Sequence, residues 1–185
     1  MSQTKNQDCA EQMIFSAAER INPAFAKSVQ KTVQDAYNNQ QIQDNPIDLY
    51  TFFGIKTPES NIIVYWGKNK DELKTGLQTL DTTHNYFLRT GTNGGGGHYQ
   101  LLHFEHSCWH IYSSPSNKYT VTNEKGDITE EGKTLLAPYA IWGTARNAYS
   151  YSFTMVSTNT ILGVIDYMIN VRTHSYEYAL EELFK

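Results

Sequence analysis

The first regular pattern in the chain lies in residues 9–20, where apolar side chains recur at helical spacing. Cys9, Met13 and Ala17 stand four residues apart, so they share one side of a helix. This spacing is typical of an amphipathic helix that packs its apolar face on a core. Asp8 precedes the pattern and suits the capping position, because its carboxylate can accept from the first backbone N–H groups.

A second helix is predicted directly after the first. Asn22 suits the cap and Pro23 suits the first helical position, where the missing N–H of proline has no cost. The helix is expected to end near residue 40, and residues 41–60 read as a loop. Its apolar stripe comprises Phe25, Val29, Val33 and Tyr37.

Beyond residue 60 the pattern changes to short β-branched or alternating runs, which are typical of strands. The run NIIVYW at 61–66 predicts a buried strand, and residues 69–80 predict a helix. The remaining expected strands lie at 84–90, 98–104, 108–114 and 118–122 and within 139–156. Helices are expected at 159–171 and from about 175 to 184.

The order of these elements predicts the fold class. Helices come first, a mostly antiparallel sheet follows, and helices return at the end, which is the α+β arrangement. No repeat or linker divides the sequence, and 185 residues suffice to bury one sizeable core. We therefore expect a single domain over residues 1–185.

Composition narrows the classes of partner. The net charge of −4 gives no electrostatic reason to bind a nucleic acid. No apolar run approaches the roughly 18 residues of a membrane span. The polar N-terminus lacks the apolar core of a signal peptide. Two cysteines are too few for a disulfide-stapled secreted domain, so a reducing compartment is the simpler interpretation.

Cys9 is the candidate nucleophile. A thiolate is favoured at the N-terminus of a helix, where the dipole and unpaired N–H groups stabilise negative charge. The same N–H groups suit the oxyanion of an acyl-transfer intermediate. The alternative interpretation is a small buried hydrophobe on the apolar stripe.

His98 is the candidate base. It opens a predicted strand directly after Asn93 and the four glycines 94–97. Glycines allow another backbone to approach closely, which a peptide substrate beside a catalytic base requires. The alternative is a flexible hairpin loop with a histidine at its edge.

A third candidate follows from strand geometry. If residues 105–107 form the turn, Phe104 pairs with Cys108 and His98 pairs with Ser114, and paired residues point to the same face. Ser114 would then fix the tautomer of His98, as the third member of a triad does. A slip of one residue would put Ser113 or Pro115 there, and an ordinary serine at a strand end is the alternative.

Taken together, these residues resemble the papain-like cysteine proteases. The shared features are a cysteine at the head of the first helix, a Gly-His pair opening a later strand, and a polar residue sixteen positions on. The segment GGHYQLL is similar to the Gly-His-Tyr strand of ubiquitin-specific deubiquitinases. More narrowly, the order Cys9, His98, Ser114 resembles bacterial effector deubiquitinases that use a Cys-His-Ser triad and prefer linear ubiquitin chains.

The chain departs from the papain pattern in two places. Ala10 follows Cys9, where papain-like enzymes carry tryptophan, and no Asn or Asp follows His98 at the usual spacing. Gln3 has the spacing of the papain oxyanion donor but lies at the terminus. The backbone N–H of Cys9, with a side chain from Asn6 or Gln7, is the preferred oxyanion site.

The resemblance implies a thiol protease that acts on ubiquitin or polyubiquitin as a secreted effector in host cytoplasm, without a cofactor. We expect a monomer. A Gly-Gly tail such as that of ubiquitin needs a tunnel without side chains, and the expected substrate-binding residues are Gly94, Gly95, Gly96, Gly97 and Tyr99.

Other constellations are weaker. The residues His103, His106, Cys108 and His110 resemble a metal cluster, but they match no compact zinc spacing and strand alternation divides them; we expect no metal. Two further functions stay open: a glutamine deamidase or peptidoglycan amidase with the same Cys-His pair, and a non-catalytic module that binds peptides through its aromatic surface.

Overall fold

The computed structural model describes residues 9–39, 56, 61–67, 70–92, 97–136 and 149–170. Within these residues lies a six-stranded sheet in the order β1-β6-β2-β3-β4-β5, in which every neighbouring pair is antiparallel. The strands are β1 (Asn61–Gly67), β2 (Tyr86–Thr92), β3 (Gly97–Glu105), β4 (Cys108–Ser114), β5 (Asn117–Thr120) and β6 (Tyr149–Met155). The helices are α1 (Cys9–Ile21), α2 (Pro23–Asn38), α4 (Lys70–Thr79), α5 (Glu130–Leu135) and α6 (Thr158–Asn170).

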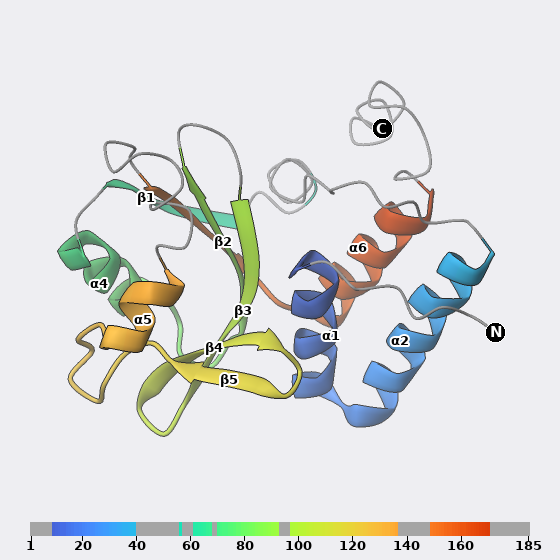
Figure 1. Cartoon of the computed structure of the whole chain (residues 1–185), viewed down its shortest axis with the longest axis horizontal. Helices are drawn as coiled ribbons and strands as arrows, with labels where there is room; N and C mark the ends of the chain where they lie inside the picture. The colour runs from blue at the N-terminus through green and yellow to red at the C-terminus, as the bar shows by residue number, and fades with distance from the viewer. Residues whose placement is uncertain are drawn as a thin grey trace.

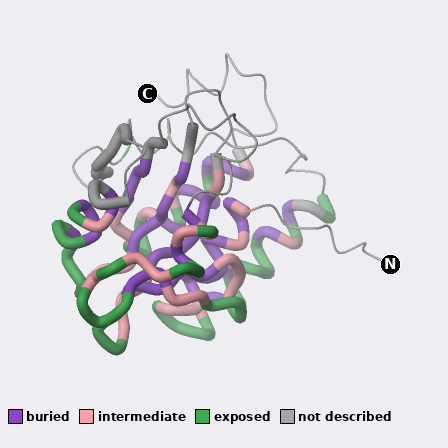
Figure 2. The backbone as a smooth tube through the Cα atoms, turned by 60° about the vertical axis from the view of Figure 1, so that its left-hand side comes forward, coloured by how far each residue is buried: buried purple, intermediate pink, exposed green. Residues whose placement is uncertain are grey.

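The helices lie on both faces of the sheet (Figure 1). Helices α1, α2 and α6 share one core with strand residues such as Phe87 and Leu101. Helix α4 and the end of α5 share a second core with residues such as Leu88 and Leu102. Figure 2 shows that buried residues follow the strands and the helices facing them, while exposed residues gather at the turns. The predicted α+β class is confirmed.

The two N-terminal helices form as their sequence predicts. Asn22 caps α2, because its Oδ1 accepts a hydrogen bond from the backbone N–H of Ala24 at 2.8 Å. Helix α1 begins at Cys9, and Asp8, its expected cap, lies outside the described residues. None of the helices that the structure describes is long and apolar enough to cross a membrane.

The hairpin between β3 and β4 corrects one expectation. The turn consists of the two residues His106 and Ser107, both with positive φ (52° and 63°), and not of residues 105–107. Such backbone angles match a two-residue turn, whose twist suits the flanking strands. Glu105 therefore pairs with Cys108, and the register is one residue away from the expected one.

Helix α5 is an element that the sequence pattern did not predict. The Thr129 hydroxyl caps it by accepting from the Gly132 N–H at 2.9 Å. Strand β5 ends at Thr120, two residues earlier than expected. The expected loop at 41–60, apart from Lys56, the strand residues before 149 and the last helix at 175–184 lie outside the described residues.

Candidate active site

Cys9 occupies the first turn of α1 and is half-buried. Its side chain packs against the core that contains Tyr99 and Leu101, and α1 contacts β3 and β4. Neither Cys9 nor Cys108 forms a disulfide. The thiol thus lies where the first N–H groups of a 13-residue helix favour negative charge.

His98 follows Gly97 at the start of β3 and pairs with Thr90 on β2. The residue is half-buried, and this burial lowers the pKa of the imidazole below its ordinary value of 6.5. Desolvation disfavours the charged ring, so His98 is neutral near pH 7. A neutral imidazole is the form that a general base requires.

The first turn of α1 and the first residues of β3 lie at the same end of the molecule (Figure 1). Strand alternation nevertheless directs neighbouring side chains of β3 to opposite faces. Tyr99 belongs to the core that Cys9 contacts, whereas Leu102, in phase with His98, belongs to the core on the α4 side. By strand phase, His98 therefore belongs to the face opposite the core that Cys9 contacts, at the start of β3.

Ser114 ends β4 and pairs with Asn117 of β5. Between β3 and β4 the pairs run from Glu105 and Cys108 to Leu101 and Tyr112, and they do not include His98 or Ser114. Continued in this register, Ser114 would face Tyr99. The expected direct pairing of His98 with Ser114 is wrong in register, because the turn is one residue shorter than assumed.

The other predicted site residues fall in different environments. Gly97 pairs with Gly91 at the start of β3, and Tyr99 is 8% exposed within the α1 core. Ser113 is partly buried and lies at the register shift of β4 between Tyr112 and Ser114, where strand alternation does not fix its face. The residues Gln3, Asn6, Gln7, Gly94, Gly95 and Gly96 lie outside the described part of the chain.

Two histidines of the β3–β4 hairpin, His103 and His110, are held by protein groups. His103 Nδ1 lies 2.6 Å from Asn85 Oδ1, and its Nε2 lies 3.3 Å from a carboxylate oxygen of Glu105. His110 Nε2 donates to the Glu105 carbonyl at 3.1 Å. Among the described residues, no three His, Cys, Asp or Glu side chains are grouped as metal ligands.

Two residues that the sequence analysis missed lie beside His98. Thr90, its partner on β2, and Gln100, two residues along β3, are both buried. Alternation places them in phase with Leu88 and Leu102, on the face of the α4 core. The sequence did contain a signal for Thr90. This residue stands two residues after Leu88 and four after Tyr86, so in a strand it shares the buried face of these two residues.

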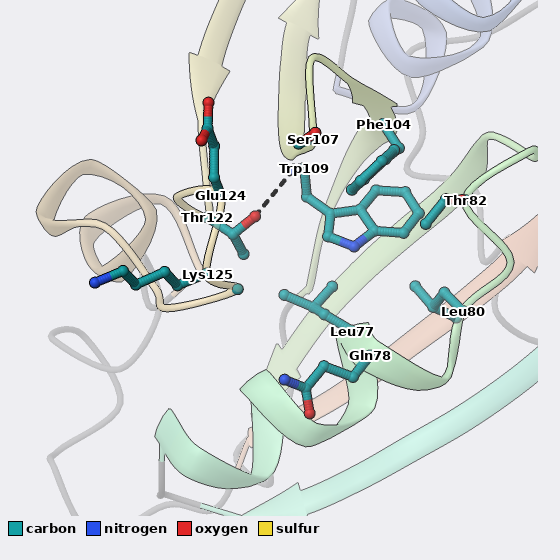
Figure 3. A pocket seen from close by; sticks show the side chains of 11 residues that line it. Leu77, Gln78, Leu80, Thr82, Phe104, Ser107, Trp109, Thr122, Glu124 and Lys125 are labelled. Carbon is teal, nitrogen blue, oxygen red and sulfur yellow. Dashed lines mark hydrogen bonds between the residues drawn. The ribbon is translucent and has the colours of Figure 1, made fainter.

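A separate pocket of about 250 Å³ lies at the far end of β3, beside the β3–β4 turn (Figure 3). Its wall includes Phe104 and Trp109, whose rings meet edge to face with centroids 5.0 Å apart. The Trp109 backbone N–H donates to the Thr122 hydroxyl at 2.9 Å. This concavity supplies the aromatic surface that a peptide-binding module would need, at a distance from Cys9 and His98.

Fold and site together define an α+β domain in which a thiol opens a helix packed on the sheet and a histidine begins one of the contacted strands. A solved structure with a similar fold is RavD (residues 1–200) from Legionella pneumophila (strain Corby). The two are 29% identical, the match covers 95% of this chain and 92% of that one, and the TM-score is 0.62. No family model and no curated protein matches the sequence.

Proposed function

We propose that this chain is a cysteine peptidase that hydrolyses ubiquitin linkages, with linear chains as the preferred substrate. The observation that carries the proposal is the similarity to RavD over 95% of the chain, together with the order Cys9, His98, Ser114. The resemblance to papain-like effector deubiquitinases supplies the activity, the substrate and action in a host cell. The placement of Cys9 at a helix start supports the nucleophile.

The reaction begins with transfer of the Cys9 thiol proton to the His98 imidazole. The thiolate attacks the carbonyl carbon of the scissile amide, and backbone N–H groups at the start of α1 stabilise the oxyanion. Collapse of this intermediate breaks the C–N bond, and His98 gives its proton to the leaving amine. Water then attacks the thioester with His98 as base, which releases the carboxylate and restores the thiol.

The lowered pKa of His98 matches this cycle. A ring that is neutral near pH 7 can accept the thiol proton, and the partly buried setting strengthens its attraction to the thiolate once it is charged. Ser114 is proposed to orient the ring. Ser113 is the alternative, because a shift of one residue along β4 would exchange the two serines.

The glycines at 94–97 are proposed to form one wall of the substrate channel. In the sequence they follow Asn93 and lead directly to His98, and Gly97 is the first residue of β3. A wall without side chains accepts an extended Gly-Gly tail and excludes bulkier peptides, which would restrict cleavage to ubiquitin-like C-termini.

The decisive experiment incubates a panel of ubiquitin dimers of different linkage with the wild type, Cys9→Ala and Cys108→Ala. We expect the wild type and Cys108→Ala to cleave linear dimers fastest, and Cys9→Ala to be inactive. Cys108→Ala is the matched control, because it removes the other half-buried thiol. Cys108 begins β4 and lies opposite Glu105, the last residue of β3.

A second probe is a ubiquitin with an electrophile at its C-terminus, which should label Cys9 alone. Absence of both cleavage and labelling would overturn the proposal. If the protein instead released ammonia from glutamine side chains through Cys9, the deamidase alternative would take its place. Peptide binding lost on Trp109→Ala and kept in Cys9→Ala would favour the aromatic pocket as the functional surface.

A further inference from the structure

His98 has a polar neighbour that the triad does not use. Thr90 pairs with it across β2 and β3, and directly opposed residues in an antiparallel pair point to the same face with Cβ atoms about 4.5–5.5 Å apart. Ser114 holds no such pair with His98. Thr90 is thus the hydroxyl that the sheet register itself brings to the imidazole.

The Thr90 hydroxyl is also buried, and it makes no hydrogen bond to the described residues. The residue is 1% exposed, and among the residues that the structure describes its Oγ1 has no hydrogen-bond partner. Gln100 is 2% exposed, and its Oε1 likewise has no partner. Buried polar atoms are nearly always satisfied, because leaving one unpaired costs free energy. Two such oxygens on the sheet face of His98 leave acceptors there that a donor on the same face can use.

The neighbours of Thr90 do not account for its hydroxyl. On the other side, Thr90 pairs with Tyr151 of β6, and that tyrosine donates its own hydroxyl to the Leu136 carbonyl at 3.2 Å. The alternate positions along β2, Tyr86 and Leu88, are large and pack in the α4 core. Valine at position 90 would pack beside Tyr86 and Leu88 as well as threonine does, so packing does not explain the hydroxyl.

We propose that Thr90 is a positioning residue for His98: its hydroxyl oxygen accepts a hydrogen bond from a ring N–H of the imidazole in the reactive state. The other ring nitrogen is then left as the acceptor for the Cys9 proton. Gln100 lies farther along the same strand and lines this face without holding the ring. The inference rests on the proposed peptidase function, and it assigns to Thr90 the orienting role for which Ser114 and Ser113 are the other candidates.

The test compares Thr90→Val, Thr90→Ser, Gln100→Leu and Ser114→Ala in cleavage of linear ubiquitin dimers. Because a hydrogen bond of ordinary strength corresponds to about a tenfold change in rate, Thr90→Val should lower kcat about tenfold with little change in KM. Thr90→Ser keeps the hydroxyl and should restore most of kcat. Thr90→Val should melt no lower than the wild type, because it removes an unsatisfied buried group. Full activity in Thr90→Val, or equal losses in Thr90→Val and Thr90→Ser, would overturn the proposal.

A spectroscopic readout separates this inference from the proposed function. Nitrogen NMR of ¹⁵N-histidine-labelled protein reports the tautomer of His98, with His98→Gln to assign its signals. We expect one dominant tautomer in the wild type and in Gln100→Leu, and a mixture in Thr90→Val. If the wild type cleaves no ubiquitin but Thr90→Val still changes the tautomer, the proposed substrate is refuted and the positioning role of Thr90 stands. An unchanged tautomer in Thr90→Val refutes the positioning role whatever the activity.

Discussion

Glu105 lies directly opposite Cys108, where β3 turns into β4. This pair fixes the register of the hairpin, so Phe104 meets Trp109 and Leu101 meets Tyr112. It also keeps Cys108 on a strand beside an acidic residue, whereas Cys9 opens a helix.

The turn itself offers a stabilising substitution. Ser107 has a φ of 63°, in the left-handed region that costs an L-residue about 1 kcal/mol and costs glycine little. Ser107→Gly should therefore raise the free energy of unfolding by up to about 1 kcal/mol, measured by urea titration. Ser116→Gly, in the next turn, is the control and should not stabilise. Equal stability of Ser107→Gly and the wild type would contradict the assigned turn.

Helix α5 depends on a glycine that lies close to Val121, the residue that follows β5. A Cβ on Gly132 would lie 2.5 Å from the Val121 carbonyl oxygen and 3.1 Å from its Cα. Backbone atoms cannot yield cheaply, so Gly132→Ala should lower the free energy of unfolding by about 1–3 kcal/mol. Thr134→Ala, at an exposed position of the same helix, is the control and should change it little. Chemical denaturation measures both, and a neutral Gly132→Ala would show that α5 lies farther from Val121.

The two thiols should differ in reactivity. The N-terminus of α1 favours the Cys9 thiolate, while Cys108 lies in a strand without a helix end. Iodoacetamide at about pH 6 should modify Cys9 much faster than Cys108, as peptide mass spectrometry would show. His98→Gln should slow the modification of Cys9 and leave that of Cys108 unchanged. Two equally slow thiols would instead indicate a binding module.

The Glu105 carboxylate should give stability a defined pH dependence. Its hydrogen bond from Lys118, at 2.6 Å, is the main cause that lowers the pKa from 4.5 to about 2. A depressed carboxyl pKa stabilises the fold above the unfolded value, and this stabilisation is lost as the pH falls through the folded value. The effect is modest, because the pair is partly exposed to solvent.

Lys118→Gln tests this dependence. The wild type should exceed it in free energy of unfolding near pH 5, and the difference should vanish towards pH 2. Lys31→Gln breaks an exposed ion pair with Asp35 in α2 and controls for the loss of one positive charge. A stability difference that is constant over this range would mean that the Glu105 carboxylate does not carry it.

Local sequence predicted the helices well because their signals are local. The four-residue spacing from Cys9 and the Asn22-Pro23 pair set the bounds of α1 and α2 to within two residues. Helix α5 escaped because it has six residues, too few to show a period. It is held by tertiary contacts, such as the Thr129 hydroxyl on the Thr120 carbonyl at 2.7 Å.

The hairpin register escaped prediction for a different reason. His106 and Ser107 carry none of the Asn-Gly signal of a two-residue turn, so their positive φ is imposed by the pairing of the flanking strands. The predicted turn was one residue too long, and this error alone placed Ser114 opposite His98 in the predicted register.

By itself, the sequence determined that Cys9 opens a helix, that His98 opens a strand and that the fold is α+β, because spacing and capping act over a few residues. Only the tertiary structure decided which residues meet across strands. Pairing between β2 and β3 set Thr90 opposite His98, and pairing between β3 and β4 withdrew Ser114 from that place. The physical reason is the two-residue period of a strand: each one-residue shift in register exchanges the faces of all its side chains.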